Sequence, residues 1–139
     1  MIMKIKVTFS IFLLIFILSG YTPGKSANSD KGDPAAPRID FKESVHDFGE
    51  IITGAEAVHY FVFTNSGESP LVVLNVRASC GCMASAWPKA PVAAGAKDSL
   101  RVEYNTKIRG SFNKSISVQT NAENALVELK IRGNVIKAK

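Results

Sequence analysis

The sequence predicts an all-β fold, a sandwich of two antiparallel sheets, and three observations carry this prediction. Apolar and polar side chains alternate with a period of two in several stretches, clearly so in residues 98–104, and no helical period of 3.6 is convincing after the N-terminal region. β-Branched and aromatic residues are concentrated in these stretches. Clusters of turn-forming residues separate them at intervals of about 8–12 residues, which is typical of an immunoglobulin-like β-sandwich.

About seven strands are expected along the chain. They lie at residues 38–42, 47–51, 57–64, 71–78, 98–104, 112–120 and 126–135. The segment between the fourth and fifth strands holds a Cys80-Gly81-Cys82 turn and two prolines, Pro88 and Pro91, and is predicted as a loop. Since no helical crossover separates the strands, we expect antiparallel pairing. A small closed barrel is the alternative architecture.

The N-terminus is typical of a signal peptide. Lys4 and Lys6 precede an apolar run of 12 residues, 7–18, which fits a signal sequence and is short for a bilayer span of about 20 residues. An uncleaved membrane anchor is the competing interpretation. Tyr21 stands where a bacterial lipoprotein signal would place its lipidated cysteine, so no such anchor is expected.

The expected organisation is therefore a signal peptide at residues 1–27, a flexible leader at 28–37 and one sandwich domain at 38–137. The leader is polar and holds Pro and Gly, with little to bury. We expect a periplasmic or secreted protein with no membrane span after cleavage.

The charge of the predicted mature chain argues against nucleic-acid binding. The whole chain carries +5, but residues 1–27 contribute three lysines and no acid, so the remainder carries +2. Its basic residues are dispersed rather than clustered, whereas a nucleic-acid partner requires a basic patch.

Several sequence blocks together resemble a known bacterial family, the domain of unknown function 1573, which is common in exported proteins of Bacteroidetes-type bacteria. The blocks are His46-Asp47-Phe48-Gly49-Glu50-Ile51, Phe61-Val62-Phe63-Thr64-Asn65-Ser66-Gly67, Pro70-Leu71-Val72-Val73, Ser79-Cys80-Gly81-Cys82, Tyr104-Asn105-Thr106, Gly110-Ser111-Phe112-Asn113-Lys114 and Val118-Gln119-Thr120-Asn121. The resemblance spans nearly all of residues 40–135. It implies a sandwich of the major sperm protein and pilus-chaperone type and leaves the activity open. Met83 stands where the family has Thr.

Cys80 and Cys82 are the candidate site with the most chemical content. An even cysteine count in an exported protein favours a disulfide between them, and Gly81 relieves the crowding of so tight a turn. A bridge across one residue closes a loop too short to stabilise the fold much. Free thiols buried in the turn and redox-active thiols are the alternatives.

Copper is the alternative cofactor. Two thiolates on one turn could hold Cu(I), with Met83 as a third ligand. A closed zinc site would have to combine Cys80 and Cys82 with the two histidines, His46 and His59. Otherwise no cofactor is expected.

The histidines are predicted to be structural. His46 precedes Asp47, whose carboxylate is expected to accept from backbone donors of the Phe48-Gly49 turn rather than to form an acid–base pair. His59 lies inside an alternating strand as a half-buried residue. Neither signatures of hydrolases nor phosphate or dinucleotide loops occur, so we expect a non-enzymatic binding or structural envelope module with an unknown protein partner.

Overall fold

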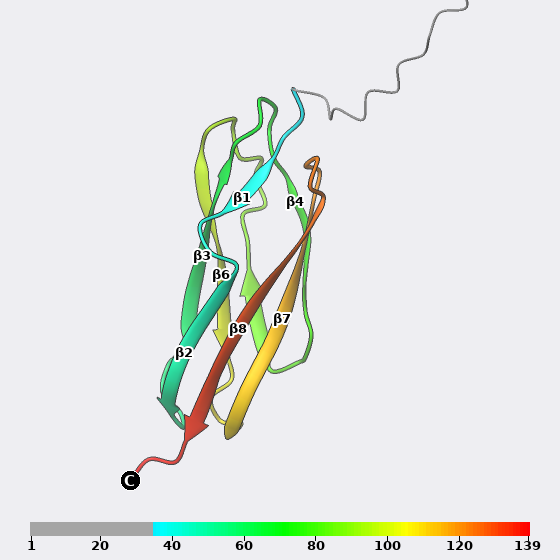
Figure 1. Cartoon of the computed structure of the whole chain (residues 1–139). Helices are drawn as coiled ribbons and strands as arrows, with labels where there is room; N and C mark the ends of the chain where they lie inside the picture. The colour runs from blue at the N-terminus through cyan, green and yellow to red at the C-terminus, as the bar shows by residue number, and fades with distance from the viewer. Residues whose placement is uncertain (1–34) are drawn as a thin grey trace, which may run out of the picture. The chain divides into compact units, whose positions relative to one another are not determined.

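Residues 35–139, the part of the chain that the computed structural model describes, form two facing four-stranded sheets (Figure 1). The strands are β1 (Ile39–Phe41), β2 (Val45–Ile52), β3 (Val58–Asn65), β4 (Val73–Ala78), β5 (Met83–Ala86), β6 (Lys97–Tyr104), β7 (Gly110–Thr120) and β8 (Leu126–Ile136). One sheet has the order β1-β3-β6-β5 and the other β2-β8-β7-β4. This arrangement confirms the predicted immunoglobulin-like sandwich. The predicted signal peptide and most of the leader lie outside the described residues, among which no helix could span a membrane.

The chain changes sheets immediately after its first strand. β1 pairs antiparallel with β3, and β2 then pairs with β8 in the other sheet (Figure 1). The β2–β8 pairing is parallel, so the expectation of purely antiparallel sheets was wrong at this one ladder. Parallel neighbours need a long connection. Here the connection is the rest of the domain, from β3 to β7, so no helical crossover is required.

β5 is a strand that the sequence did not predict. The cysteine turn and the segment after it, as far as Gly95, were expected to be a loop, but Met83–Ala86 pair with β6 and form the edge of their sheet. This strand has only four residues, Met-Ala-Ser-Ala, without a β-branched or aromatic side chain. Its local β-propensity is therefore weak, and pairing with β6 fixes its conformation.

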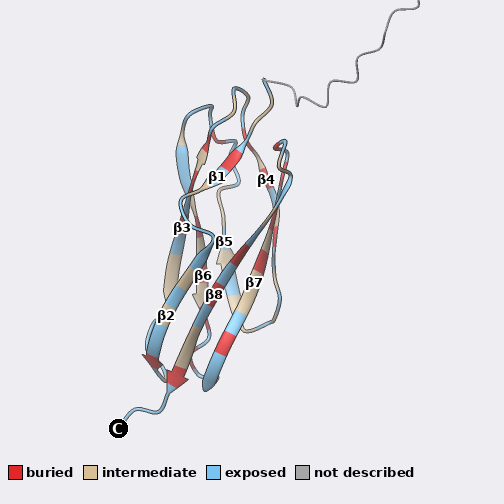
Figure 2. Cartoon of the chain, viewed as in Figure 1, coloured by how far each residue is buried: buried red, intermediate tan, exposed pale blue. Residues whose placement is uncertain are grey.

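The core lies between the sheets and is built by the alternation that predicted the strands (Figure 2). Phe61 and Leu100 are fully buried and face each other in the β3–β6 register, while Ile116 and Leu129 do the same in β7–β8. Each such side chain contributes roughly 1.5–3 kcal/mol when it leaves water. The apolar positions of the strands were expected to form the core, and most do, but Val62, Leu74 and Leu126 are exposed.

Asn65, from the family-like Phe-x-Asn-x-Gly block, is a structural residue. Its fully buried amide donates to the carbonyls of Ser69, at 2.8 Å, and Val92, at 3.0 Å. Its oxygen accepts from the backbone N–H groups of Arg38 and Gly67. A Cβ on Gly67 would lie 2.6 Å from the Cα of Pro37, so only glycine allows this approach. The motif therefore holds the segment at Arg38, where the domain begins, against the loops that contain Ser69 and Val92.

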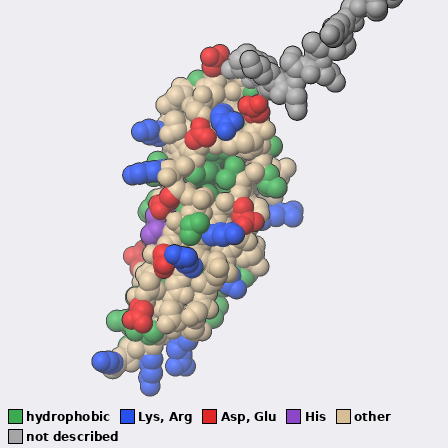
Figure 3. Space-filling model, viewed as in Figure 1, with side chains coloured by type: hydrophobic (Ala, Val, Ile, Leu, Met, Phe, Trp, Pro, Cys, Tyr) green, Lys and Arg blue, Asp and Glu red, His purple; other side chains and the backbone are tan. Residues whose placement is uncertain are grey.

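Charged side chains are mixed on the surface. On the face shown in Figure 3, Lys and Arg side chains are interspersed with Asp and Glu over most of the domain, several Lys or Arg side chains gather at its lower end, and no continuous basic track runs along it. The absence of a nucleic-acid partner stays a prediction.

Candidate functional site

The cysteine turn joins the two sheets at one lateral side of the sandwich. It connects β4, an edge of one sheet, with β5, an edge of the other. The structure pairs Cys80 and Cys82 in a disulfide with a Cα–Cα distance of 5.2 Å, within the usual range for disulfides. Both residues are half-buried. The turn is also tied to β6, because Asn105 donates its backbone N–H to the Cys82 carbonyl at 2.9 Å.

An open depression lies beside the disulfide. Its lining residues are Gly81, Cys82, Met83, Ala84, Glu103 and Asn105. Trp87 follows β5 and packs against the core, and the Lys89 ammonium lies 3.3 Å from the centre of its ring. Trp87 is therefore mainly a packing residue, while Cys82 and Met83 are reachable from solvent.

Copper binding at this turn would require the reduced protein. In the disulfide form neither sulfur offers a thiolate, and Cu(I) prefers thiolate and thioether ligands. Binding of copper by Cys80, Cys82 and Met83 stays a prediction for the reduced chain.

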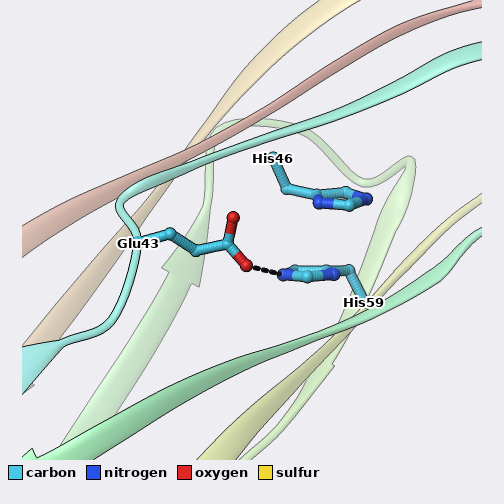
Figure 4. A group of neighbouring side chains, drawn as sticks. All are labelled: Glu43, His46 and His59. Carbon is cyan, nitrogen blue, oxygen red and sulfur yellow. Dashed lines mark ion pairs between the residues drawn. The ribbon is translucent and has the colours of Figure 1, made fainter.

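The two histidines lie together on the opposite lateral side of the sandwich. His46 comes from β2 and His59 from β3, on the side away from β4 and β5. Their rings are stacked, with centroids 3.6 Å apart and planes 8° apart (Figure 4). The strand orders separate them from the cysteine turn by the width of the sheets, so a zinc site that combines both pairs does not form.

Glu43 completes this histidine cluster. It lies in the crossover between β1 and β2, which is held by backbone hydrogen bonds from Lys42 to Val62 and from Lys130 to Ser44. Its carboxylate lies beside the edges of the stacked rings, with Oε1 2.9 Å from His59 Nε2 (Figure 4). This is close enough for an ion pair with a protonated His59, yet Nε2 is buried without a partner of hydrogen-bond geometry.

The surroundings of His46 lower its pKa. Burial lowers its pKa, and the neighbouring His59 lowers it further, while Glu43 and Asp47 act in the opposite direction. Its ring also meets the edge of Phe48, with centroids 4.6 Å apart. A neutral imidazole keeps a lone pair free for hydrogen bonding or metal binding.

Asp47 does not take part in this cluster. Its carboxylate accepts from the Gly49 backbone N–H at 2.8 Å and from Arg132 Nε at 2.9 Å, as expected for the turn. The Gly49 hydrogen bond, followed by Arg132, lowers the pKa of Asp47. Gly49 has a φ of 64° at the point where β2 shifts register against β8. The predicted structural role of Asp47 is confirmed.

The sequence did not predict that the histidines meet. His59 was correctly expected on a strand, while His46 was expected just before the strand at 47–51 and lies inside β2, which begins at Val45. The two residues are 13 positions apart on strands of different sheets. Only the sheet switch after β1 brings β2 over β3. The one signal in the sequence is alternation, which places His59 on the same strand face as Phe61 and Phe63, and His46 on the same face as Phe48.

The sequence itself decides the family. Residues 39–135 match the model of a family described as a protein of unknown function (DUF1573). The chain belongs to the DUF1573 family. No curated protein matches this DUF1573 chain.

Solved structures share the fold of this DUF1573 domain. A protein of unknown function from Porphyromonas gingivalis W83 has a TM-score of 0.66 at 17% identity, covering 77% of this chain and 51% of its own. The chain thus spans about half of that protein. The PapD-like domain 7 of human CEP192 has a TM-score of 0.61 at 10% identity, covering 86% of this chain and 100% of its own. The YadV chaperone has a TM-score of 0.52 at 11% identity, and the match covers 70% of this chain and 51% of the chaperone. At these identities the likeness shows the fold alone.

Proposed function

We propose that this DUF1573 protein is an exported, non-enzymatic module that binds an extended segment of a partner protein along β5. The signal-like N-terminus and the pairing of both cysteines support export to an oxidising compartment, periplasmic or outside the cell. The observation that carries the binding proposal is the difference between β5 and the three other sheet edges.

Three edges have features that oppose pairing with another chain. β1 has only three residues, with Asp40 at its centre, and β2 carries a bulge between Asp47 and Glu50. β4 is irregular between Val73 and Asn75 and contains Arg77. Short length, bulges and charge are the usual protections of edge strands.

β5 has neither a charge nor a bulge. Met83–Ala86 pair with Tyr104–Arg101 of β6 in unbroken register, and the four side chains include no charge and no proline. Ala84 and Ala86 are exposed and small. Apart from its short length, this edge has no protection, so the backbone of a partner can approach it closely.

The register identifies the free backbone groups of β5. The Asn105–Cys82 hydrogen bond makes that pair a hydrogen-bonded one, and such pairs alternate along an antiparallel ladder. Ala84 and Ala86 therefore bond to β6, while the backbone groups of Met83 and Ser85 point away from it. A partner strand would pair with these groups, as in strand addition to a sheet edge.

Site-specific photo-crosslinking in the source cells tests this function. A photoreactive residue in place of Ala84 on β5 should link one partner, whereas the same residue in place of Gln119, exposed on the central strand β7, should not. A synthetic peptide from the linked segment should then bind the purified protein directly.

The control variants act on one backbone donor. Ser85→Pro removes the outward N–H and should weaken peptide binding at least tenfold, while Ser85→Ala keeps that N–H and should bind like the wild type. Equal crosslinking at Ala84 and Gln119, or equal binding by both Ser85 variants, would contradict the proposal.

A further inference from the structure

We propose that Glu43, His46 and His59 form a binding site for a divalent transition-metal ion such as Zn²⁺. The site is independent of β5, because it lies on the opposite lateral side of the sandwich. Each residue offers one ligand atom, and the three atoms lie within 4.8 Å of one another. Two imidazoles with one carboxylate are a donor set that zinc and other borderline metals prefer.

The contact between Glu43 and His59 is the first reason to expect a cation. Oε1 and Nε2 are 2.9 Å apart, and Nε2 is buried with no partner of hydrogen-bond geometry. A buried, unsatisfied nitrogen is costly, and the carboxylate beside it is negative. A metal ion bonded to both atoms would satisfy the nitrogen and neutralise the carboxylate together.

The position of His46 is the second reason. It faces His59 from the other sheet, with ring centroids 3.6 Å apart, so a second imidazole lies within reach of the same ion. Imidazole nitrogens are the commonest metal ligands in proteins. The chain contains only two histidines, and both are in this cluster.

Binding requires a defined local movement. The two rings are parallel, so their lone pairs point side by side rather than to one point. Rotation about each Cβ–Cγ bond would let the nitrogens converge to the separation of about 3.4 Å that a tetrahedral zinc ion imposes. Glu43 follows easily, because it lies on an exposed crossover.

The bound ion would link the two sheets at this lateral side of the sandwich. It would link β2, β3 and the crossover between β1 and β2. The link would lie beyond the β1–β3 ladder, because β1 pairs only with residues Phe63–Asn65 of β3. Three protein ligands leave one coordination position for water or for a partner's side chain.

Calorimetric titration of the protein expressed from the whole chain with ZnCl₂ tests the site. The wild type should bind one Zn²⁺ per chain with a dissociation constant in the micromolar range or below. His46→Gln, His59→Gln and Glu43→Gln should each weaken binding at least tenfold. Glu56→Gln, a change of an exposed acid on the β2–β3 turn, is the matched control and should bind like the wild type.

Two further measurements distinguish this site from zinc binding at the cysteine turn or at scattered surface carboxylates. The Cys80→Ser/Cys82→Ser double variant should keep full zinc affinity, which excludes the sulfurs as ligands. Zn²⁺ should also shift the ring ¹⁵N resonances of both histidines, which reports on the site even if a variant folds poorly. Absence of Zn²⁺ binding with the metal in excess over the chain, or unchanged affinity in the three ligand variants, would overturn the proposal.

Discussion

At the scale of single residues, the family-like motif builds the fold rather than a site. The side chain of Asn65 forms hydrogen bonds with four backbone groups. The side chain of Asn124 bonds two backbone groups of β1, since it accepts from the Ile39 N–H at 3.1 Å and donates to the Ile39 carbonyl at 2.7 Å. Polar side chains thus satisfy backbone N–H and carbonyl groups that are not paired with a neighbouring strand.

Asn65→Ala is therefore expected to lower the free energy of unfolding by about 2–4 kcal/mol, since it leaves buried N–H and carbonyl groups without partners. Urea denaturation measures this difference. Asn113→Ala, at an exposed position of β7, should change stability by less than about 0.5 kcal/mol. Equal effects of the two variants would contradict the structural role of Asn65.

Tyr104 gives a prediction for alkaline pH. It is 4% exposed, stacks on Phe112 with ring centroids 3.7 Å apart, and burial raises its pKa above 10.0. In the unfolded chain the phenol ionises near pH 10, but in the fold it ionises only at higher pH. The unfolded state is thus favoured increasingly as the pH rises above about 10, and the stability that Tyr104 contributes is lost.

Thermal unfolding of Tyr104→Phe should show a smaller loss of Tm between pH 9 and 11 than the wild type. Tyr60→Phe, at an exposed phenol on β3, is the control and should keep the wild-type loss. An identical pH dependence in wild type and Tyr104→Phe would show that burial of this phenol has no effect on stability.

At the scale of strands, periodicity predicted seven of the eight strands and the inward faces of the long ones. In β6 and β7, alternating apolar residues specify both the strand and its buried side. It could not find β5, whose four residues are defined by pairing with β6. Nor could it find the parallel β2–β8 ladder, because strand order depends on contacts between residues more than 80 positions apart.

The same limit applies to the candidate sites. The disulfide turn was predictable because Cys80 and Cys82 are two residues apart and constrain each other locally. The histidine cluster depends on the sheet switch at residues 42–44, which no local pattern encodes. The local motif therefore predicted the cysteine turn, while long-range pairing created both the β5 edge beside it and the histidine cluster on the other side.

At the scale of the whole domain, the two lateral sides differ in what they offer. One side has the disulfide turn and the open β5 edge, and the other has the histidine cluster under the crossover. The central claim is that β5 is free to accept a partner strand. The claim is best tested with the protein expressed from the whole chain.

Amide hydrogen exchange, measured residue by residue by NMR on that protein, tests the claim most directly. The N–H groups of Met83 and Ser85, which point away from β6, should exchange at least about a hundredfold faster than those of Ala84 and Ala86, which bond to it. Equally slow exchange at all four residues would mean that the edge is already covered, and would contradict the assignment of β5 as the binding edge.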